Sequence, residues 1–354
     1  MPRRSISRRH ILKASTALAL SAYATPIRAQ APQASAITPA LIEAAKKEGK
    51  VVFYTSIDLL LAEKIAKAFE TKYPGIGVRI ERSGAERIFQ RIGQEYSSGI
   101  RAVDVVNSSD ASHLIVWKRD GLLAPYLPED VAKYYKPEHQ DADGMYASFR
   151  FNLLVLGYNT DLVKAEDAPK SFADLLDPKW KGKIVKAHPG YSGGILTSTF
   201  ETARDLGWSY FEKLAKQNVM QVQSATDPPK KLALGERAIM ADGADYVLFQ
   251  LKDAGKPVEV IYPAEGTPIG AGPNGIFKAA PNPNAARLFQ SYCFTAEAQQ
   301  LIIDVGALRS VHPQTKERPG RKPLSEIKTM KEDPAEVEKT SEEIKARCTK
   351  IFRV

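Results

Sequence analysis

The stretch Val51-Val52-Phe53-Tyr54-Thr55-Ser56-Ile57-Asp58 decides how this chain folds. Its first four residues are β-branched or aromatic, and the apolar run stops at two hydroxyls. The next residues, 59–69, place apolar side chains at helical spacing. This pattern predicts a buried strand that leads directly into a helix. Ligands of open α/β sheets bind at the carboxyl ends of the strands, so Thr55, Ser56 and Asp58 are candidate binding residues.

The same order of strand, small polar residues and helix recurs along the chain. Strands are predicted at 75–82 and 102–106, and further strand-to-helix transitions follow near 192 and 245. Strands that alternate with helices at this spacing indicate an α/β fold with a largely parallel sheet. We expect the polar ends to converge on one cleft, which adds these candidate residues: Ser83, Ser108, Ser109, Asp110, Ser192, Gly193, Gly194, Asp245 and Tyr246.

The helix starts favour an anionic ligand. Free backbone N–H groups and the helix dipole give such an end roughly half a positive charge, which suits phosphate or carboxylate. Gly193 and Gly194 favour ligand contact at their helix start, because a glycine pair lets a ligand approach the backbone closely. Asp58, Asp110 and Asp245 are typical of dipole-satisfied helix starts; two of them facing the cleft would instead favour a solute of mixed charge.

Composition argues against nucleic acid as a partner. The 354 residues carry a formal net charge of +9, but six uncompensated Arg and Lys residues lie within residues 1–30. Without that segment the charge is about +3. The basic balance therefore reflects the N-terminus, and the length is sufficient for two lobes with separate cores.

Residues 1–30 are predicted to be a cleaved export signal. Arg8 and Arg9 precede Ile11-Leu12-Lys13, a short apolar core and small residues near the cleavage point. The paired arginines are similar to a twin-arginine signal, and an arginine-rich general secretory signal is the alternative. Both predict export, which in a bacterium means the periplasm. Residues 31–45 are predicted to be a leader.

Cys293 and Cys348 are the only cysteines, and their spacing excludes paired-cysteine metal sites. In an oxidising compartment they form either one disulfide or two buried thiols, and both alternatives stay open at this point.

Several phrases together resemble one family. They are 49–56, 102–106, 121–125, Leu176-Asp177-Pro178-Lys179-Trp180-Lys181-Gly182-Lys183-Ile184, and 281–289. The chain resembles type 2 periplasmic solute-binding proteins of ABC importers, in the group that includes ferric-ion, sugar-phosphate, aminoalkylphosphonate and thiamine binders. The resemblance extends over about residues 48 to 312.

The resemblance implies two α/β lobes joined by crossover strands that close on a solute. One lobe would hold 46–146 plus about 272–312, and the other 147–271 plus about 313–354 with a C-terminal helix. Thr267 lies in a loop that often contacts solute in this class. The implied partners are a small solute and an inner-membrane ABC permease. We expect a monomer with no cofactor, no nucleic acid and no catalysis.

The first choice of solute is a small organic compound that carries phosphate, phosphonate or carboxylate, and Asp58, Ser109, Ser192 and Tyr246 are the test residues. Ferric ion is the alternative within the family. The resemblance aligns iron-ligand positions with Asp58, Ser109, Asp245 and Tyr246, of which Asp58, Asp245 and Tyr246 offer anionic oxygens.

Two functions of other classes remain as alternatives. A periplasmic enzyme is disfavoured because the sequence contains no H-E-x-x-H motif. An adaptor that presents solute to a chemoreceptor would have the same fold and cleft, so the sequence does not separate it from a transport protein.

Overall fold

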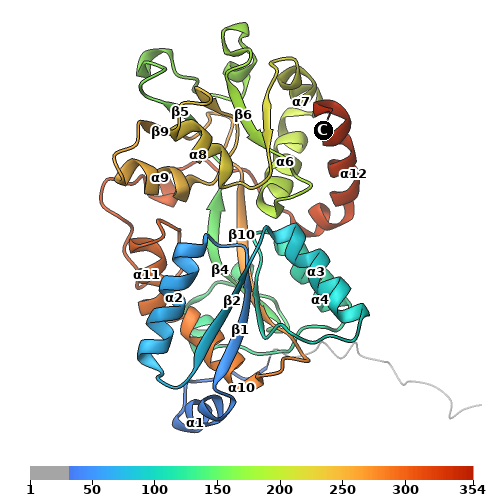
Figure 1. Ribbon diagram of the computed structural model, residues 1–354, viewed down its shortest axis with the longest axis vertical. Helices are drawn as coiled ribbons and strands as arrows, with labels where there is room; N and C mark the ends of the chain where they lie inside the picture. Colours follow the sequence, from blue (N-terminus) through green and yellow to red (C-terminus); the bar gives the residue numbers. More distant parts are fainter. Residues whose placement is uncertain (1–31, 354) are drawn as a thin grey trace, which may run out of the picture. The chain divides into compact units, whose positions relative to one another are not determined.

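The computed structural model describes residues 32–353, which form two five-stranded sheets with helices packed on them (Figure 1). The first sheet has the order β2-β1-β3-β10-β4, and the second has the order β7-β6-β8-β5-β9. The strands are β1 (Lys50–Thr55), β2 (Gly77–Arg82), β3 (Val105–Asn107), β4 (Tyr146–Leu153), β5 (Leu156–Asn159), β6 (Ile184–Ala187), β7 (Met220–Val222), β8 (Ile239–Met240), β9 (Val258–Ile261) and β10 (Ile269–Ile276).

Twelve α-helices connect and cover these strands in the described residues. They are α1 (Pro39–Glu48), α2 (Leu59–Lys72), α3 (Ala85–Ser97), α4 (Ala111–Arg119), α5 (Glu129–Tyr134), α6 (Gly193–Leu206), α7 (Trp208–Ala215), α8 (Asp227–Ala233), α9 (Asp245–Asp253), α10 (Pro283–Cys293), α11 (Ala296–Asp304) and α12 (Pro334–Phe352). Five short 3-10 turns lie at Pro137–His139, Ala165–Asp167, Ala173–Leu176, Pro178–Trp180 and Leu324–Glu326.

The prediction of a buried strand followed by a helix at 51–69 is confirmed. β1 pairs in parallel with β2 on one side and with β3 on the other. Its side chains alternate between two faces, so Val51 and Phe53 pack with α2, whereas Val52 and Tyr54 pack with α3 and α4. This strand therefore organises two apolar clusters of the first sheet.

The chain crosses between the two sheets at two places. β4 leads into β5 through residues 154–155, and β9 leads into β10 through residues 262–268. We refer to the first sheet with α1–α5, α10 and α11 as the first lobe, and to the second sheet with α6–α9 as the second lobe. The predicted boundaries at 146/147 and 271/272 fall inside β4 and inside β10, although both strands pair along their length in the first sheet.

The predicted leader at 31–45 is wrong from Pro39 onward, because α1 begins there. Thr38 caps this helix by accepting a hydrogen bond from Leu41 N at 3.2 Å, and Pro39 occupies the first turn. At the other end, Glu48 accepts hydrogen bonds from the backbone N–H groups of Asn284 and Ala285. The helix is thus tied to the start of α10. The predicted export signal at 1–30 lies outside the described residues.

The predicted C-terminal helix is present as α12. Its apolar residues Val337, Ile344 and Cys348 form a buried cluster with Leu196 of α6. Cys293 and Cys348 are both buried and unpaired, so the structure contains no disulfide between them. Among the described residues, no helix combines the length and the apolar character needed to cross a membrane.

Candidate functional site

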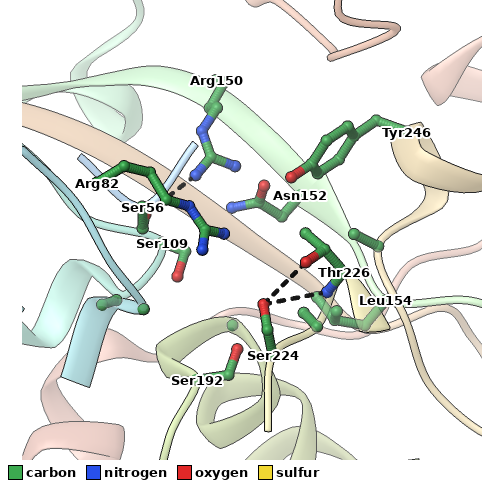
Figure 2. Close-up of a pocket in the computed structure, with 15 residues that line it drawn as sticks. Ser56, Arg82, Ser109, Arg150, Asn152, Leu154, Ser192, Ser224, Thr226 and Tyr246 are labelled. Atoms are coloured by element: carbon green, nitrogen blue, oxygen red, sulfur yellow. Dashed lines mark hydrogen bonds between the residues drawn. The ribbon is translucent and has the colours of Figure 1, made fainter. Parts of the chain in front are cut away.

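A cavity of about 30 Å³ lies where strand ends of the first lobe meet helix starts of the second lobe (Figure 2). β1, β2 and β4 contribute from the first sheet, and α6 and α9 begin on the opposite side. The lining residues are Ser56, Arg82, Gly84, Ala85, Ser109, Arg150, Asn152, Leu154, Ser192, Gly194, Ser224, Ala225, Thr226, Ala244 and Tyr246.

Arg150 is the dominant charge of the cavity. It projects from the middle of β4, and its side chain is 2% exposed. Its Nη2 atom donates to Ser56 Oγ at 3.3 Å and to Asn107 Oδ1 at 3.4 Å, whereas Nε has no partner. Burial lowers the pKa of this guanidinium to about 10, which still leaves it charged at neutral pH. Within residues 32–353 no carboxylate forms an ion pair with Arg150.

Gly272 makes room for this arginine. A Cβ atom at that position of β10 would lie 3.0 Å from Arg150 Cγ and 3.2 Å from its Cζ. The guanidinium therefore lies across the neighbouring strand, where it faces the cavity rather than solvent (Figure 2).

Further donors surround the same space. Arg82, at the end of β2, donates from Nε to Ile57 O at 3.1 Å and forms no ion pair within the described chain. The Nδ2 group of Asn152 is buried without a hydrogen-bond partner. Tyr246 is buried beside Arg150, and burial raises the pKa of its phenol, so it remains a neutral hydrogen-bonding group.

Three helices begin at the cavity without a side-chain cap. The N-cap residues of α3, α6 and α9 are Gly84, Ser192 and Ala244, and none makes a capping hydrogen bond through a side chain. All three residues line the cavity. The first-turn N–H groups of these helices therefore add partial positive charge to that of the two arginines. No lining residue is acidic.

The two lobes touch directly at the edge of the cavity. A Cβ atom on Gly84 would lie 2.6 Å from Tyr191 O, and one on Gly193 would lie 2.5 Å from Asp110 Cβ. Contacts this short exclude larger side chains, so the glycines permit the lobes to approach. Gly193 is therefore needed for packing between the lobes, whereas the sequence-based interpretation had predicted that it contacts the ligand.

Five of the predicted binding residues line the cavity, and they come from both lobes. They are Ser56, Ser109, Ser192, Gly194 and Tyr246. The predicted convergence of strand ends and helix starts is therefore present for these residues.

The other predicted residues lie outside the cavity because the fold already uses them. Thr55 Oγ1 accepts from Ile57 N at 3.1 Å, Asp58 Oδ1 from Leu60 N at 3.1 Å, and Asp110 Oδ1 from Ser112 N at 2.9 Å. Each oxygen thus satisfies a nearby backbone N–H group.

Ser83, Ser108 and Thr267 also lie outside it. Ser83 precedes the N-cap residue of α3 and does not line the cavity. Ser108 Oγ is 2.9 Å from His113 Nδ1. Thr267 is fully buried and pairs through its backbone with the segment at 328–330.

Asp245 is an ion-pair residue of the core. Its Oδ2 atom accepts from Arg321 Nη2 at 2.6 Å and from Arg309 Nε at 3.3 Å, and all three side chains are nearly inaccessible. The three oxygens proposed for iron therefore do not meet: Asp58 caps α2, Asp245 binds two arginines, and only Tyr246 lines the cavity.

The sequence-based interpretation missed Arg82, Arg150, Asn152, Ser224 and Thr226. A signal for two of them exists, because Arg150 and Asn152 lie two residues apart in an otherwise apolar strand and so share one face. Ser224 and Thr226 follow β7, a strand of three residues whose sequence carries no apolar run.

Comparison with protein families matches residues 64–335 of this chain to the model of the bacterial extracellular solute-binding protein family. A probable ABC transporter periplasmic-binding protein of Sinorhizobium fredii is 25% identical over 211 residues, which cover 57% of this chain and 58% of that protein.

Two solved structures share the fold. The periplasmic binding protein AfuA of Actinobacillus pleuropneumoniae, with fructose-6-phosphate bound, has a TM-score of 0.79 at 24% identity, covering 86% of this chain and 99% of that one. Iron-bound HitA of Pseudomonas aeruginosa has a TM-score of 0.73 at 24% identity, covering 85% and 99%. At this identity the two similarities establish the two-lobed fold alone.

Proposed function

The chain belongs to the bacterial extracellular solute-binding protein family, and we propose that it captures a small organic anion for an ABC importer. The solute would carry a phosphate, phosphonate or carboxylate group and would bind in the cavity between the two lobes. The proposal includes hinge closure of the lobes, cleavage of the predicted signal at 1–30 and a periplasmic location.

The observation that carries this proposal is the buried, unpaired guanidinium of Arg150. A buried charge is costly unless an opposite charge compensates it, and within the described chain only neutral groups bind this one. An anionic group in the cavity would supply the compensation through charge-assisted hydrogen bonds. The uncapped starts of α3, α6 and α9 point to the same charge sign.

The hydroxyl groups opposite the arginines suit the remainder of such a solute. Ser192, Ser224 and Thr226 lie on the second-lobe side of the cavity (Figure 2). Ser224 Oγ and Thr226 Oγ1 are 3.0 Å apart and form a hydroxyl pair. Since no acidic side chain lines the cavity, an ammonium group would find no ion-pair partner, which favours a purely anionic solute over a zwitterion.

Ferric ion is a weaker fit to this chain. Fe(III) is a hard cation that prefers several anionic oxygen ligands. Two guanidinium groups and one neutral phenol would face it in this cavity. We therefore treat iron as the competing outcome of the experiment rather than as a second proposal.

Calorimetric titration of the purified full chain tests the proposal. The panel contains inorganic phosphate, a sugar phosphate, an alkylphosphonate, a dicarboxylate and ferric citrate. We expect at least one phosphate- or phosphonate-bearing compound to bind with micromolar or better affinity. Binding of iron without any organic anion, with a coloured tyrosinate complex, would overturn the proposal.

Mass spectrometry of compounds that co-purify with the protein complements the panel by naming candidate solutes. Each candidate can then be tested by thermal melting, because a solute present far above its dissociation constant raises the melting temperature. Consumption of a bound compound by the protein would indicate an enzyme instead.

A further inference from the structure

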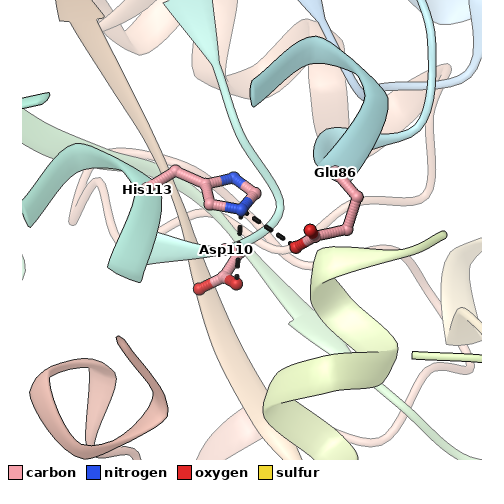
Figure 3. A group of neighbouring side chains, drawn as sticks. All are labelled: Glu86, Asp110 and His113. Carbon is pink, nitrogen blue, oxygen red and sulfur yellow. Dashed lines mark hydrogen bonds and ion pairs between the residues drawn. The ribbon is translucent and has the colours of Figure 1, made fainter. Parts of the chain in front are cut away.

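Next to the cavity, one buried imidazole connects the start of α3 with the residues that lead into α4. His113 Nε2 lies 3.0 Å from Glu86 Oε1 (Figure 3). Its Nδ1 atom lies 2.9 Å from Ser108 Oγ. Glu86 is in the first turn of α3, directly after the lining residues Gly84 and Ala85. Ser108 precedes Ser109, which lines the cavity just before Asp110, the N-cap residue of α4. The imidazole thus fixes the position of both starts relative to each other.

The surroundings hold this imidazole in place. Phe89 stacks on it with a centroid distance of 4.5 Å, and Trp117 lies at 5.9 Å. The second oxygen of Asp110 is buried without a hydrogen-bond partner, 3.8 Å from His113 Nε2. Two acids therefore face His113, and the pKa of its imidazole is raised despite burial, which favours the charged form.

The remaining oxygen of Glu86 belongs to a contact with α12. Lys345 Nζ donates to Glu86 Oε2 at 2.7 Å, and the side chain of Glu86 is 1% exposed. Lys345 also pairs with Glu342 one turn earlier in α12, at 3.0 Å. This lysine is the donor that reaches Glu86 from outside the first lobe.

The buried apolar cluster of α12 belongs to the second lobe, although the helix also lies against α4 of the first lobe. Val337, Ile344 and Cys348 pack with Leu196, and Phe200 and Trp208 border the same cluster. These partners lie in α6 and α7. The polar contacts of α12 with the first lobe are Lys345 with Glu86 and Glu338 with Arg119, and the latter pair is on the surface. Because apolar burial is the larger contribution, α12 is expected to move with the second lobe.

We propose that Lys345 is a positioning residue of the solute site, which locks the Glu86–His113 pair and the cavity-lining starts of α3 and α4 when the lobes close. The inference rests on the proposed function for its effect on affinity. Its effect on closure does not depend on any solute.

A cysteine trap measures closure without solute. A Cβ atom at Gly194 would lie 3.9 Å from Ser109 Cβ, within the roughly 3.5–4.5 Å that a disulfide spans. In the Ser109→Cys/Gly194→Cys protein, the rate of disulfide formation under a fixed oxidant reports how often the lobes close. Cys293 and Cys348 are buried and do not compete.

Three substitutions are compared in this background. Lys345→Met is expected to slow trapping about tenfold, because Glu86 loses one of its two charged partners. Lys345→Arg should restore the rate to within about threefold. Lys339→Met is the matched control, since Lys339 lies on the same helix, is 66% exposed and, among residues 32–353, pairs with Glu336 alone. It should trap within twofold of the parent.

The second measurement uses the otherwise unaltered chain with inorganic phosphate as the calorimetric probe. Lys345→Met should weaken binding about tenfold, with a melting temperature of the solute-free protein that matches the Lys339→Met variant. Equal trapping rates for the two variants would overturn the inference. Absence of phosphate binding in the parent would instead count against the proposed function, because the trapping rates are obtained without solute.

Discussion

At the scale of single residues, substitution of Arg150 is expected to lower the affinity for solute without lowering the stability of the protein. Arg150→Met keeps the length of the side chain but removes a buried charge that has no acidic partner in the described chain. We expect affinity for the organic anion to fall by about 100-fold or more, as loss of charge-assisted hydrogen bonds predicts. The melting temperature of the solute-free protein should stay equal or rise, because an apolar replacement of a buried charge is often neutral or stabilising.

Titration calorimetry and thermal melting measure the two effects. Arg79→Met is the control for Arg150→Met, because Arg79 lies in the same sheet but is 70% exposed and pairs with Glu81. An Arg150→Met protein that binds normally would place the solute elsewhere.

For Asp245 we predict the opposite, namely that its substitution lowers the stability of the protein. Asp245→Asn removes the more buried of two carboxylates that pair with Arg309 and Arg321, and the other is Glu317. Because Glu317 stays as a more exposed partner of both arginines, we expect the free energy of unfolding to fall by about 3 kcal/mol, the lower end of the cost of breaking a buried ion pair. Urea denaturation measures this, and Asp253→Asn on the exposed side of the same helix should change it by less than about 0.5 kcal/mol. Unaltered stability with lost binding would return Asp245 to the solute site.

At the scale of elements, the crossover strand β10 is paired with β3 along only part of one edge. Only Asn274, Gly275 and Ile276 pair with β3. Further along that edge, Ile269 N donates to Glu201 Oε2 at 3.0 Å and Ala271 N donates to Glu332 Oε1 at 2.6 Å. The next position in this alternation is Pro273, which has no N–H group. Two carboxyl groups from α6 and the segment before α12 therefore replace a missing strand.

These carboxyl groups predict a pH dependence of stability. Burial raises the pKa of Glu201 to about 9 and that of Glu332 to about 7. In the unfolded chain both titrate near their ordinary value of about 4.3. Between that value and the folded pKa, the folded state holds more protons, so stability falls as pH rises, by up to about 1.4 kcal/mol per pH unit for each group.

Glu201→Gln removes one of the two titrations and keeps an acceptor for Ile269 N. The variant should equal the parent near pH 4 and should be more stable than the parent at pH 8. Denaturation at a series of pH values measures the difference, and a difference that does not grow with pH would contradict the assigned protonation of Glu201.

Sequence patterns predicted single helices and strands better than the contacts between them. The alternation of strands and helices, α12 and the strand-to-helix turn after β1 follow from local apolar spacing, which depends on each segment alone. The end of the leader was misplaced because α1 is held by contacts with α10, and those contacts involve residues more than two hundred positions away.

For the site, the predictable part is the sheet edge. Ser56 and Ser109 follow strands and Ser192 begins a helix, so the topology brings them together without knowledge of side-chain contacts. Hydroxyls and acids at such positions are alike in sequence, whether they face a ligand or cap a helix, which is why Thr55, Asp58 and Asp110 were included. Arg150 was missed because its role depends on the absence of an ion-pair partner in three dimensions.

At the scale of the whole molecule, the contact between lobes predicts a steric test of closure. Gly84 has φ −62° and ψ 148°, a conformation that alanine adopts without strain. The added methyl group would nevertheless lie 2.6 Å from Tyr191 O of the second lobe. Gly84→Ala should therefore weaken solute affinity about tenfold or more, because the closed form is obstructed while each lobe still folds.

Calorimetry gives the affinity, and small-angle scattering with saturating solute gives the radius of gyration, which should exceed that of the parent. Gly93→Ala on the same helix is the control, since nothing lies within 4 Å of its added Cβ. Equal affinity in both variants would show that binding does not require this contact.

The unpaired guanidinium of Arg150 also has a consequence for handling the protein. A buried cation among hydroxyls and open helix starts does not distinguish sharply between oxyanions, so phosphate or sulfate in a purification buffer would fill the cavity. Weak competitors at millimolar concentration would then mask a micromolar solute in any screen. The protein should therefore be unfolded, dialysed to remove bound anions and refolded in Tris chloride. No phosphate or sulfate then competes with the natural solute.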